Sequence, residues 1–162
     1  PCIRIFYGIG LLIKMDKTQL EEGLELAVQY EKRGGLVPTI VQDADSGDVL
    51  MLGYANQQAL KETLRSGYAT FWSTSRNELW TKGDTSGDFL KIREILVDCD
   101  QDALIYRVER CGNGACHTKD RNCKARKSCF YRRLIDGSTL EFIAEETLLN
   151  QQELNNIKRE VK

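Results

Sequence analysis

The sequence predicts an α+β fold with a strand-rich core and a few helices. Segments with the alternating or continuous apolar pattern of strands outnumber helical segments, and the two types do not alternate as βαβ units would. The 162 residues are 41% hydrophobic, which is enough to form a core. No apolar run approaches the ~20 residues of a membrane span. Two prolines and 13 glycines exclude collagen-like and low-complexity classes.

The secondary structure follows from caps, breakers and hydrophobic periodicity. Thr18 and Glu21 fit a capping box, apolar residues then recur at helical spacing, and Gly34 ends this predicted helix. A second helix is predicted to begin after Asn56 as its N-cap and to end at Gly67. Strands, the first two joined by a turn rich in Asp, Ser and Gly, are predicted at 39–42, 49–54, 69–73, 90–97, 103–110 and 129–134.

The two ends of the chain differ from its middle. Residues 1–14 contain no acidic residue and precede Met15, so we interpret them as an N-terminal extension, with an extra strand as the alternative. An export signal is not predicted because no small-residue cleavage site follows the apolar stretch. Residues 146–162 predict a short amphipathic helix, too short for a second catalytic domain. The predicted domain therefore spans residues 15–145.

Three aspartates alternate with other residues in one short stretch. If this stretch is extended, Asp98, Asp100 and Asp102 share one face and Cys99 points the other way. Crowded carboxylates repel one another unless a hard cation such as Mg²⁺ or Ca²⁺ joins them, and a solvated acidic turn is the alternative. An EF-hand is not predicted, because Ala103 stands where that loop requires glycine.

Six cysteines and one histidine, His117, offer softer metal ligands. Cys111, Cys116, Cys123 and Cys129 form no CxxC pair, which argues against a zinc ribbon and against a redox dithiol. Their spacing permits a zinc site assembled from three cysteines, whose fourth position stays open for water as in catalytic zinc sites. Buried apolar cysteines are the alternative interpretation.

Charge is balanced overall, with 23 basic and 24 acidic residues, so the net charge of −1 predicts no polyanion partner. Within residues 107–133, nine basic residues outnumber two acidic ones, which indicates an anionic ligand near the cysteines or a solvated loop face. Other side chains suit phosphate or base contacts and fit core or surface roles equally well. These substrate-binding candidates are Trp72, Ser73, Ser75, Arg76, Trp80, Lys82, Thr85 and Ser86.

Several motifs together resemble the phosphoribosyl-AMP cyclohydrolase family over about residues 36–141. They are VLMLGYAN at 49–56, FWSTSR at 71–76, LWTKGDTSG at 79–87, VDCDQDA at 97–103, ACHT at 115–118 and SCFYR at 128–132. The resemblance implies hydrolysis of the N1–C6 bond of the adenine ring of phosphoribosyl-AMP, in histidine biosynthesis. It also implies a cytoplasmic, intertwined homodimer that acts on a small molecule and binds neither membrane nor nucleic acid. Some relatives carry a fused pyrophosphatase domain after this region, for which this chain has no room, so we expect the monofunctional form.

The resemblance further implies zinc and magnesium as cofactors. Carried over by motif, the zinc ligands are Cys99, Cys116 and Cys129, with Cys99 donated by the partner subunit. The magnesium ligands are Asp98, Asp100 and Asp102. The cysteines of the ACHT and SCFYR motifs lie thirteen positions apart, more than is usual in the family. Cys123 has the usual spacing, but we favour Cys129 because flanking strand residues would fix the direction of its side chain.

The implied chemistry is the attack of a zinc-activated water on C6 of the adenine ring, because Zn²⁺ lowers the pKa of water to ~7. His117 is predicted to shuttle a proton or to stabilise an oxyanion, and an orienting hydrogen bond in the metal shell is the alternative. A zinc purine deaminase is not predicted, since its HxE and PCxxC signatures are absent. The competing prediction is a non-enzymatic zinc-binding or nucleic-acid-binding module.

Overall fold

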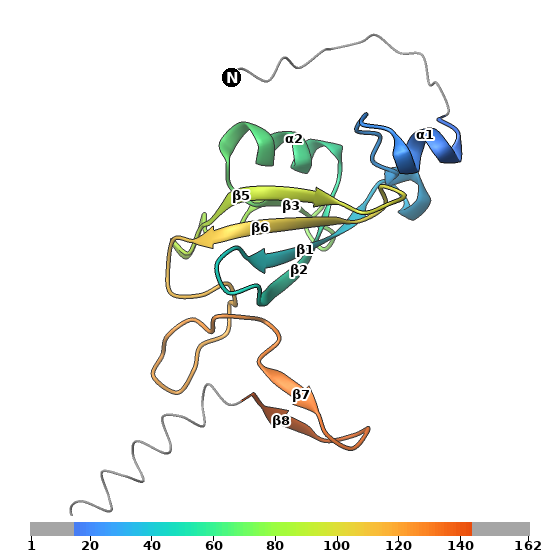
Figure 1. Ribbon diagram of the computed structural model, residues 1–162. Helices are drawn as coiled ribbons and strands as arrows, with labels where there is room; N and C mark the ends of the chain where they lie inside the picture. The colour runs from blue at the N-terminus through green and yellow to red at the C-terminus, as the bar shows by residue number, and fades with distance from the viewer. Residues whose placement is uncertain (1–14, 144–162) are drawn as a thin grey trace, which may run out of the picture.

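The computed structural model describes residues 15–143, which form a mixed α+β fold (Figure 1). This confirms the predicted fold class. The predicted extension at 1–14 and the predicted helix at 146–162 lie outside the described residues, so the domain boundaries stay predictions. In chain order the elements are α1 (Lys17–Glu22), the 3₁₀ helix η1 (Tyr30–Arg33), β1 (Val37–Asp43), β2 (Val49–Ala55), α2 (Gln57–Ser66), β3 (Thr70–Ser73), β4 (Glu78–Thr81), β5 (Leu90–Val97), β6 (Leu104–Arg110), β7 (Arg132–Leu134) and β8 (Leu140–Phe142).

The central feature is a four-stranded sheet in the order β2-β1-β6-β5. β1 runs parallel to β6, and the other neighbouring strands are antiparallel. The β3–β4 and β7–β8 hairpins form separate two-stranded sheets. α2 lies over one side of the central sheet, and β7–β8 lies at the far end of the molecule from α2 (Figure 1). Within residues 15–143, none of the helices has the length and apolar character needed to cross a bilayer.

The core lies between the central sheet and the layer formed by α2 and β3. Alternate residues of β1 and β6 are buried, as the period of two in a strand requires. Val37 and Val41 on β1 and Tyr106 on β6 have no exposed surface. Phe71 of β3 packs against Tyr106, with ring centroids 5.8 Å apart. This packing fixes the β3–β4 hairpin against the sheet.

Strong local signals gave correct predictions. The side chain of Asn56 caps α2 by accepting the backbone N–H of Ala59 at 2.8 Å, and Gly67 ends the helix at a φ of 76°. β5 matches the predicted strand at 90–97, and β1, β2, β3 and β6 match within two residues at each end. β4 and β8 were not predicted, and only the last part of the strand predicted at 129–134 is present, as β7.

The predicted helix from Thr18 to Gly34 is wrong over most of its length. α1 ends at Glu22, and its N-cap is Asp16, whose capping box is completed by Gln19. Only η1 follows, and the expected stop at Gly34 is present with a φ of 65°.

A distant side chain explains the error. Gln101, which is 6% exposed, accepts the backbone N–H of Ala27 at 2.7 Å. Its amide nitrogen donates to the carbonyl groups of Leu20 at 3.2 Å and Glu25 at 3.1 Å. These bonds hold the segment after α1 in a non-helical path beside the β5–β6 turn, and Leu24 is left fully exposed.

Candidate active site

Asp98, Asp100 and Asp102 lie in the turn between β5 and β6 and not on an extended segment, so the predicted strand geometry is wrong. Oδ1 of Asp98 accepts the backbone N–H groups of Asp102 at 2.8 Å and Ala103 at 3.0 Å, and Gln101 adopts a φ of 55°. This turn still gathers the three side chains, because one carboxylate oxygen of each lies within 4.8 Å of the others.

Two basic residues at η1 neutralise this acidic cluster. Nζ of Lys32 lies 2.5 Å from Asp100 and 3.4 Å from Asp102, and Arg33 lies 3.6 Å from Asp102. The hydrogen bond from Lys32 lowers the pKa of Asp100 and raises that of Lys32. Three carboxylates are a donor set that suits Mg²⁺, and Lys32 supplies the positive charge that a bound cation would otherwise supply.

Cys116 and Cys129 come together although they are thirteen positions apart, and each thiol influences the pKa of the other. Partial burial raises the pKa of Cys116, but hydrogen bonds from the hydroxyl and the backbone N–H of Thr118, at 3.0 and 3.4 Å, outweigh it and lower the pKa. Burial and the charge of Cys116 raise the pKa of Cys129 to about 11. The surroundings therefore favour the thiolate form at Cys116 and disfavour it at Cys129.

Backbone pairing positions Cys116. Its N–H donates to the carbonyl of Arg126 at 3.1 Å, and the N–H of Ala115 donates to that of Lys127 at 3.1 Å. Gly114 permits this approach, since a Cβ there would lie only 2.2 Å from the carbonyl oxygen of Arg126. The segment containing Cys116 is thereby held against the segment that leads to Cys129.

Cys129 is held by β2 and not by a strand of its own. Its N–H donates to the carbonyl of Leu50 at 2.7 Å, and the hydroxyl of Ser128 donates to that of Val49 at 2.8 Å. The reason given for preferring Cys129, flanking strand residues, is therefore wrong, because β7 begins only at Arg132. The hydrogen bonds to β2, and not flanking strand residues, fix the position of Cys129.

The remaining sulfur candidates lie elsewhere in the chain. Cys123 is exposed on a loop and has a φ of 59°. Cys99 is exposed in the β5–β6 turn. Among residues 15–143, the three aspartates are the one group of three or more Asp, Glu, His or Cys side chains whose ligand atoms meet within 4.8 Å. Neither Cys99 nor Cys123 therefore completes a three-ligand cluster with Cys116 and Cys129 inside one chain.

His117 and Lys82 are the two further candidate residues near the cysteine pair. His117 is exposed and follows Cys116 directly. Lys82 is only 6% exposed, and its ammonium donates a long 3.5 Å hydrogen bond to the carbonyl of Asp88. The positive charge of Lys82 opposes the rise in the pKa of Cys129. The structure thus brings a buried cation to the cysteine pair.

The predicted substrate-binding residues fall into groups. Those at the tip of the β3–β4 hairpin are Ser73, Ser75 and Arg76. Those that follow β4 at the other end are Lys82, Thr85 and Ser86. The four-residue strands separate the groups by roughly 10 Å. Arg76 pairs with Glu78 at 2.9 Å, Trp72 is half-buried, and Trp80 packs on Phe71 at 5.5 Å between ring centroids, as a core residue does.

Thr118, Lys32 and Gly114 also shape the site, but they were not predicted from the sequence. A signal for Thr118 exists, because a threonine two positions after a cysteine can return a hydrogen bond to its sulfur. Lys32 and Gly114 gave no local signal, since their partners are distant in the sequence.

Comparison with known proteins identifies the family. The family model described as phosphoribosyl-AMP cyclohydrolase matches residues 51–131. This chain belongs to the phosphoribosyl-AMP cyclohydrolase family. The protein of that name from Desulfatibacillum aliphaticivorans is 46% identical over 74% of this chain and 90% of its own length. The one from Archaeoglobus fulgidus is 50% identical over 67% of this chain and 94% of its own length.

A fused relative is also similar. The histidine biosynthesis bifunctional protein HisIE of Aquifex aeolicus is 50% identical over 66% of this chain, but the match covers 49% of that longer protein. The family predicted from the sequence motifs is thus confirmed. The region matched by the phosphoribosyl-AMP cyclohydrolase model contains the aspartate cluster, the cysteine pair, His117 and Lys82.

Proposed function

We propose that this chain hydrolyses the N1–C6 bond of the adenine ring of phosphoribosyl-AMP, giving the phosphoribosylformimino-aminoimidazole-carboxamide ribotide, at a site built on Cys116 and Cys129. The assignment of this reaction is supported by membership of the phosphoribosyl-AMP cyclohydrolase family. The chain is therefore a hydrolase of histidine biosynthesis that opens a cyclic amidine. The proximity of the thiols of Cys116 and Cys129 supports this location of the active site.

We propose that Cys116 and Cys129 hold zinc together with the partner subunit's Cys99. Paired thiols fit zinc, a borderline-soft ion that binds thiolates. When bound, zinc would supply Lewis acidity that lowers the pKa of water to ~7. One chain offers two sulfurs at this point, and the exposure of Cys99 supports its use by a second copy.

The chain's own residues would orient the sulfurs and move a proton. Thr118 holds the sulfur of Cys116 by two hydrogen bonds, and the ammonium of Lys82 offsets the negative charge of the paired sulfurs. Hydrolysis adds an oxygen to C6 and a proton to N1 of the ring. His117, which is exposed beside Cys116, is our proposed donor of the proton to N1 as the C6–N1 bond breaks.

We propose that Asp98, Asp100 and Asp102 bind Mg²⁺, which would help to hold a substrate phosphate. Their oxygen atoms lie within 4.8 Å of one another, and Lys32 already shows that the cluster attracts positive charge. Cys99 belongs to the same turn, so its donation to a partner would bring the ligands of both metals to one interface.

We infer a homodimer in a reducing, cytoplasmic setting. A hollow of about 300 Å³ at Cys99 is lined by apolar side chains that include Leu24, Leu26 and Val97, and all three are exposed. Exposed apolar surface next to a proposed shared ligand supports contact with a second copy. Free cysteines fit a compartment that keeps thiols reduced.

The test follows the ultraviolet absorbance of phosphoribosyl-AMP during turnover, with matched serine variants. We expect a chelator to abolish turnover and zinc to restore it. Cys129→Ser should lose zinc and turnover, whereas Cys123→Ser, which changes an exposed loop cysteine, should keep both. Full turnover by zinc-free protein would overturn the zinc proposal. Zinc-loaded protein that leaves the absorbance unchanged would overturn the activity and favour a non-enzymatic zinc module.

A further inference from the structure

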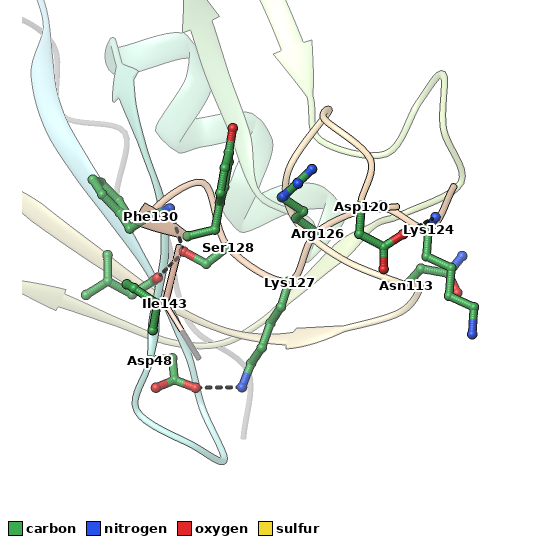
Figure 2. Close-up of a pocket in the computed structure, with 12 residues that line it drawn as sticks. Asp48, Asn113, Asp120, Lys124, Arg126, Lys127, Ser128, Phe130 and Ile143 are labelled. Carbon is green, nitrogen blue, oxygen red and sulfur yellow. Dashed lines mark hydrogen bonds and ion pairs between the residues drawn. The ribbon is translucent and has the colours of Figure 1, made fainter. Parts of the chain in front are cut away.

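A pocket of about 720 Å³, drawn in Figure 2, is lined by close sequence neighbours of Cys129. Ser128 and Phe130, the neighbours of Cys129 in the sequence, line it, and so does Arg126, whose carbonyl accepts the N–H of Cys116. A molecule bound at the two sulfurs therefore has a second compartment within reach.

The loop that lines most of this pocket is strongly basic. Residues 119–127 contain five basic residues and one acidic residue, within a chain of net charge −1. Lys124, Arg126 and Lys127 line the pocket from this loop. This is also the stretch that lengthens the spacing between Cys116 and Cys129 to thirteen positions.

The two carboxylates in the pocket wall are already engaged. Asp48 lies 2.5 Å from Nζ of Lys127, as Figure 2 shows, and the hydrogen bond from Lys127 lowers the pKa of Asp48. Oδ1 of Asp120 accepts the backbone N–H groups of Asn122 and Lys124, each at 2.8 Å, and so closes the loop. Within residues 15–143, the ammonium of Lys124 meets no carboxylate at ion-pair distance. An anion can therefore bind the ammonium of Lys124 without first breaking an ion pair.

One wall of the pocket is flat and cationic. The guanidinium of Arg126 stacks over the ring of Tyr131 at 4.3 Å and lies 5.7 Å from the ring of Phe142. The two rings stack on each other at 5.9 Å with an interplanar angle of 17°. Arg126 also donates to the carbonyl of Lys119. These contacts hold the guanidinium in place before any ligand arrives, so Arg126 loses little side-chain freedom when an anion binds.

We propose that this pocket binds a phosphoribosyl group, with the ammonium of Lys124 contacting its phosphate and the Arg126–Tyr131 stack lying along the sugar. Phosphoribosyl-AMP carries two phosphorylated riboses, so the bound group can be part of the substrate. In that case the inference rests on the proposed function. A separate ribose phosphate that binds beside the active site has the same chemistry. The two sources differ in whether the ligand competes with substrate.

The probe is ribose 5-phosphate, and the matched pair of variants is Lys124→Glu and Arg121→Glu. Both change one exposed basic residue of the same loop to an acidic one, but Arg121 does not line the pocket. Calorimetry on zinc-loaded protein should show that Lys124→Glu weakens ribose 5-phosphate binding about tenfold or more, because a charge-assisted hydrogen bond is replaced by repulsion. Arg121→Glu should weaken it less than about twofold.

Steady-state kinetics separate the two sources. If the group belongs to the substrate, Lys124→Glu raises KM about tenfold with little change in kcat, and ribose 5-phosphate competes with substrate. If it is a separate ligand, KM stays unchanged and ribose 5-phosphate binds without competing. The proposal is overturned if the wild-type protein fails to bind ribose 5-phosphate at millimolar concentration, or if both variants weaken binding equally. Calorimetry measures ribose 5-phosphate binding without turnover. A protein that binds ribose 5-phosphate but does not hydrolyse phosphoribosyl-AMP would therefore contradict the proposed function and not the pocket proposal.

Discussion

Gly114→Ala should separate the two segments that hold the cysteine pair. A Cβ at Gly114 would lie 2.2 Å from the carbonyl oxygen of Arg126 and 2.7 Å from that of Ala125, against 3.4 Å or more in ordinary contact. Because these neighbours are backbone atoms, the segments must move apart by roughly 1 Å. The 3.1 Å hydrogen bonds from Ala115 and Cys116 would then exceed the length of a normal hydrogen bond.

The expected cost follows from those two bonds. Each contributes ~0.5–1.5 kcal/mol, so about 2 kcal/mol of the free energy of unfolding should be lost. For a chain of this size, this lowers the Tm by about 4–8 °C and leaves the protein folded. Because Cys116 moves with the displaced segment, zinc bound per chain and turnover should fall in parallel.

The control is Gly137→Ala in the turn of the β7–β8 hairpin. A Cβ there has no neighbour within 4 Å, and only the φ of 83° is unfavourable, at about 1 kcal/mol. Scanning calorimetry and elemental analysis should show a smaller loss of Tm and full zinc content for this variant. A Gly114→Ala protein with the zinc content and Tm of the wild type would refute the positioning argument.

Three further perturbations test other parts of the molecule. Burial alone would raise the pKa of Asp43, but hydrogen bonds from the Ser46 backbone, Arg110 and the Asp45 backbone lower it to about 2. Its stabilisation is therefore complete above about pH 4 and is lost as the pH falls toward 2. Asp43→Asn should cost ~1–3 kcal/mol in urea unfolding at pH 7, with a difference from wild type that shrinks across that window. Equal stabilities at pH 7 would contradict this. Lys32→Met should tighten Mg²⁺ binding several-fold in calorimetry by removing a competing cation, and unchanged affinity would count against magnesium at the aspartates. Phe71→Ala should cost ~3–5 kcal/mol, since Phe71 is 1% exposed, and a loss below about 1 kcal/mol would show that the core is not packed as described.

Local chemistry decided which elements of the fold were predictable. α2 was predicted because Asn56 and Gly67 end it by contacts within a few residues. The helix from Thr18 failed because the backbone groups of that segment bond to Gln101, more than seventy positions away. β4 and β8 have four and three residues, too few for an alternating pattern to stand out.

In the candidate site, too, local sequence patterns were predictive and long-range contacts were not. The motifs supplied the candidate site residues, but they did not show how the fold holds them. Asp98, Asp100 and Asp102 lie close together because they share a turn, which is closed by backbone hydrogen bonds to the side chain of Asp98. The alternation of side chains along a strand, which we had expected, does not bring them together. Cys129 meets Cys116 because β2 anchors its backbone, a contact that no local pattern predicts.

We propose a metal site formed by Cys116 and Cys129 of one chain and the partner subunit's Cys99. Co-expression of two variants, Cys99→Ser and Cys129→Ser, tests this shared site, because each variant should be inactive alone. In random dimers, half pair one subunit of each kind, and one of the two sites in such a dimer retains all three cysteines. We therefore expect the mixture to recover about a quarter of wild-type turnover and zinc content. A mixture no more active than either parent, or full activity of Cys99→Ser alone, would contradict it.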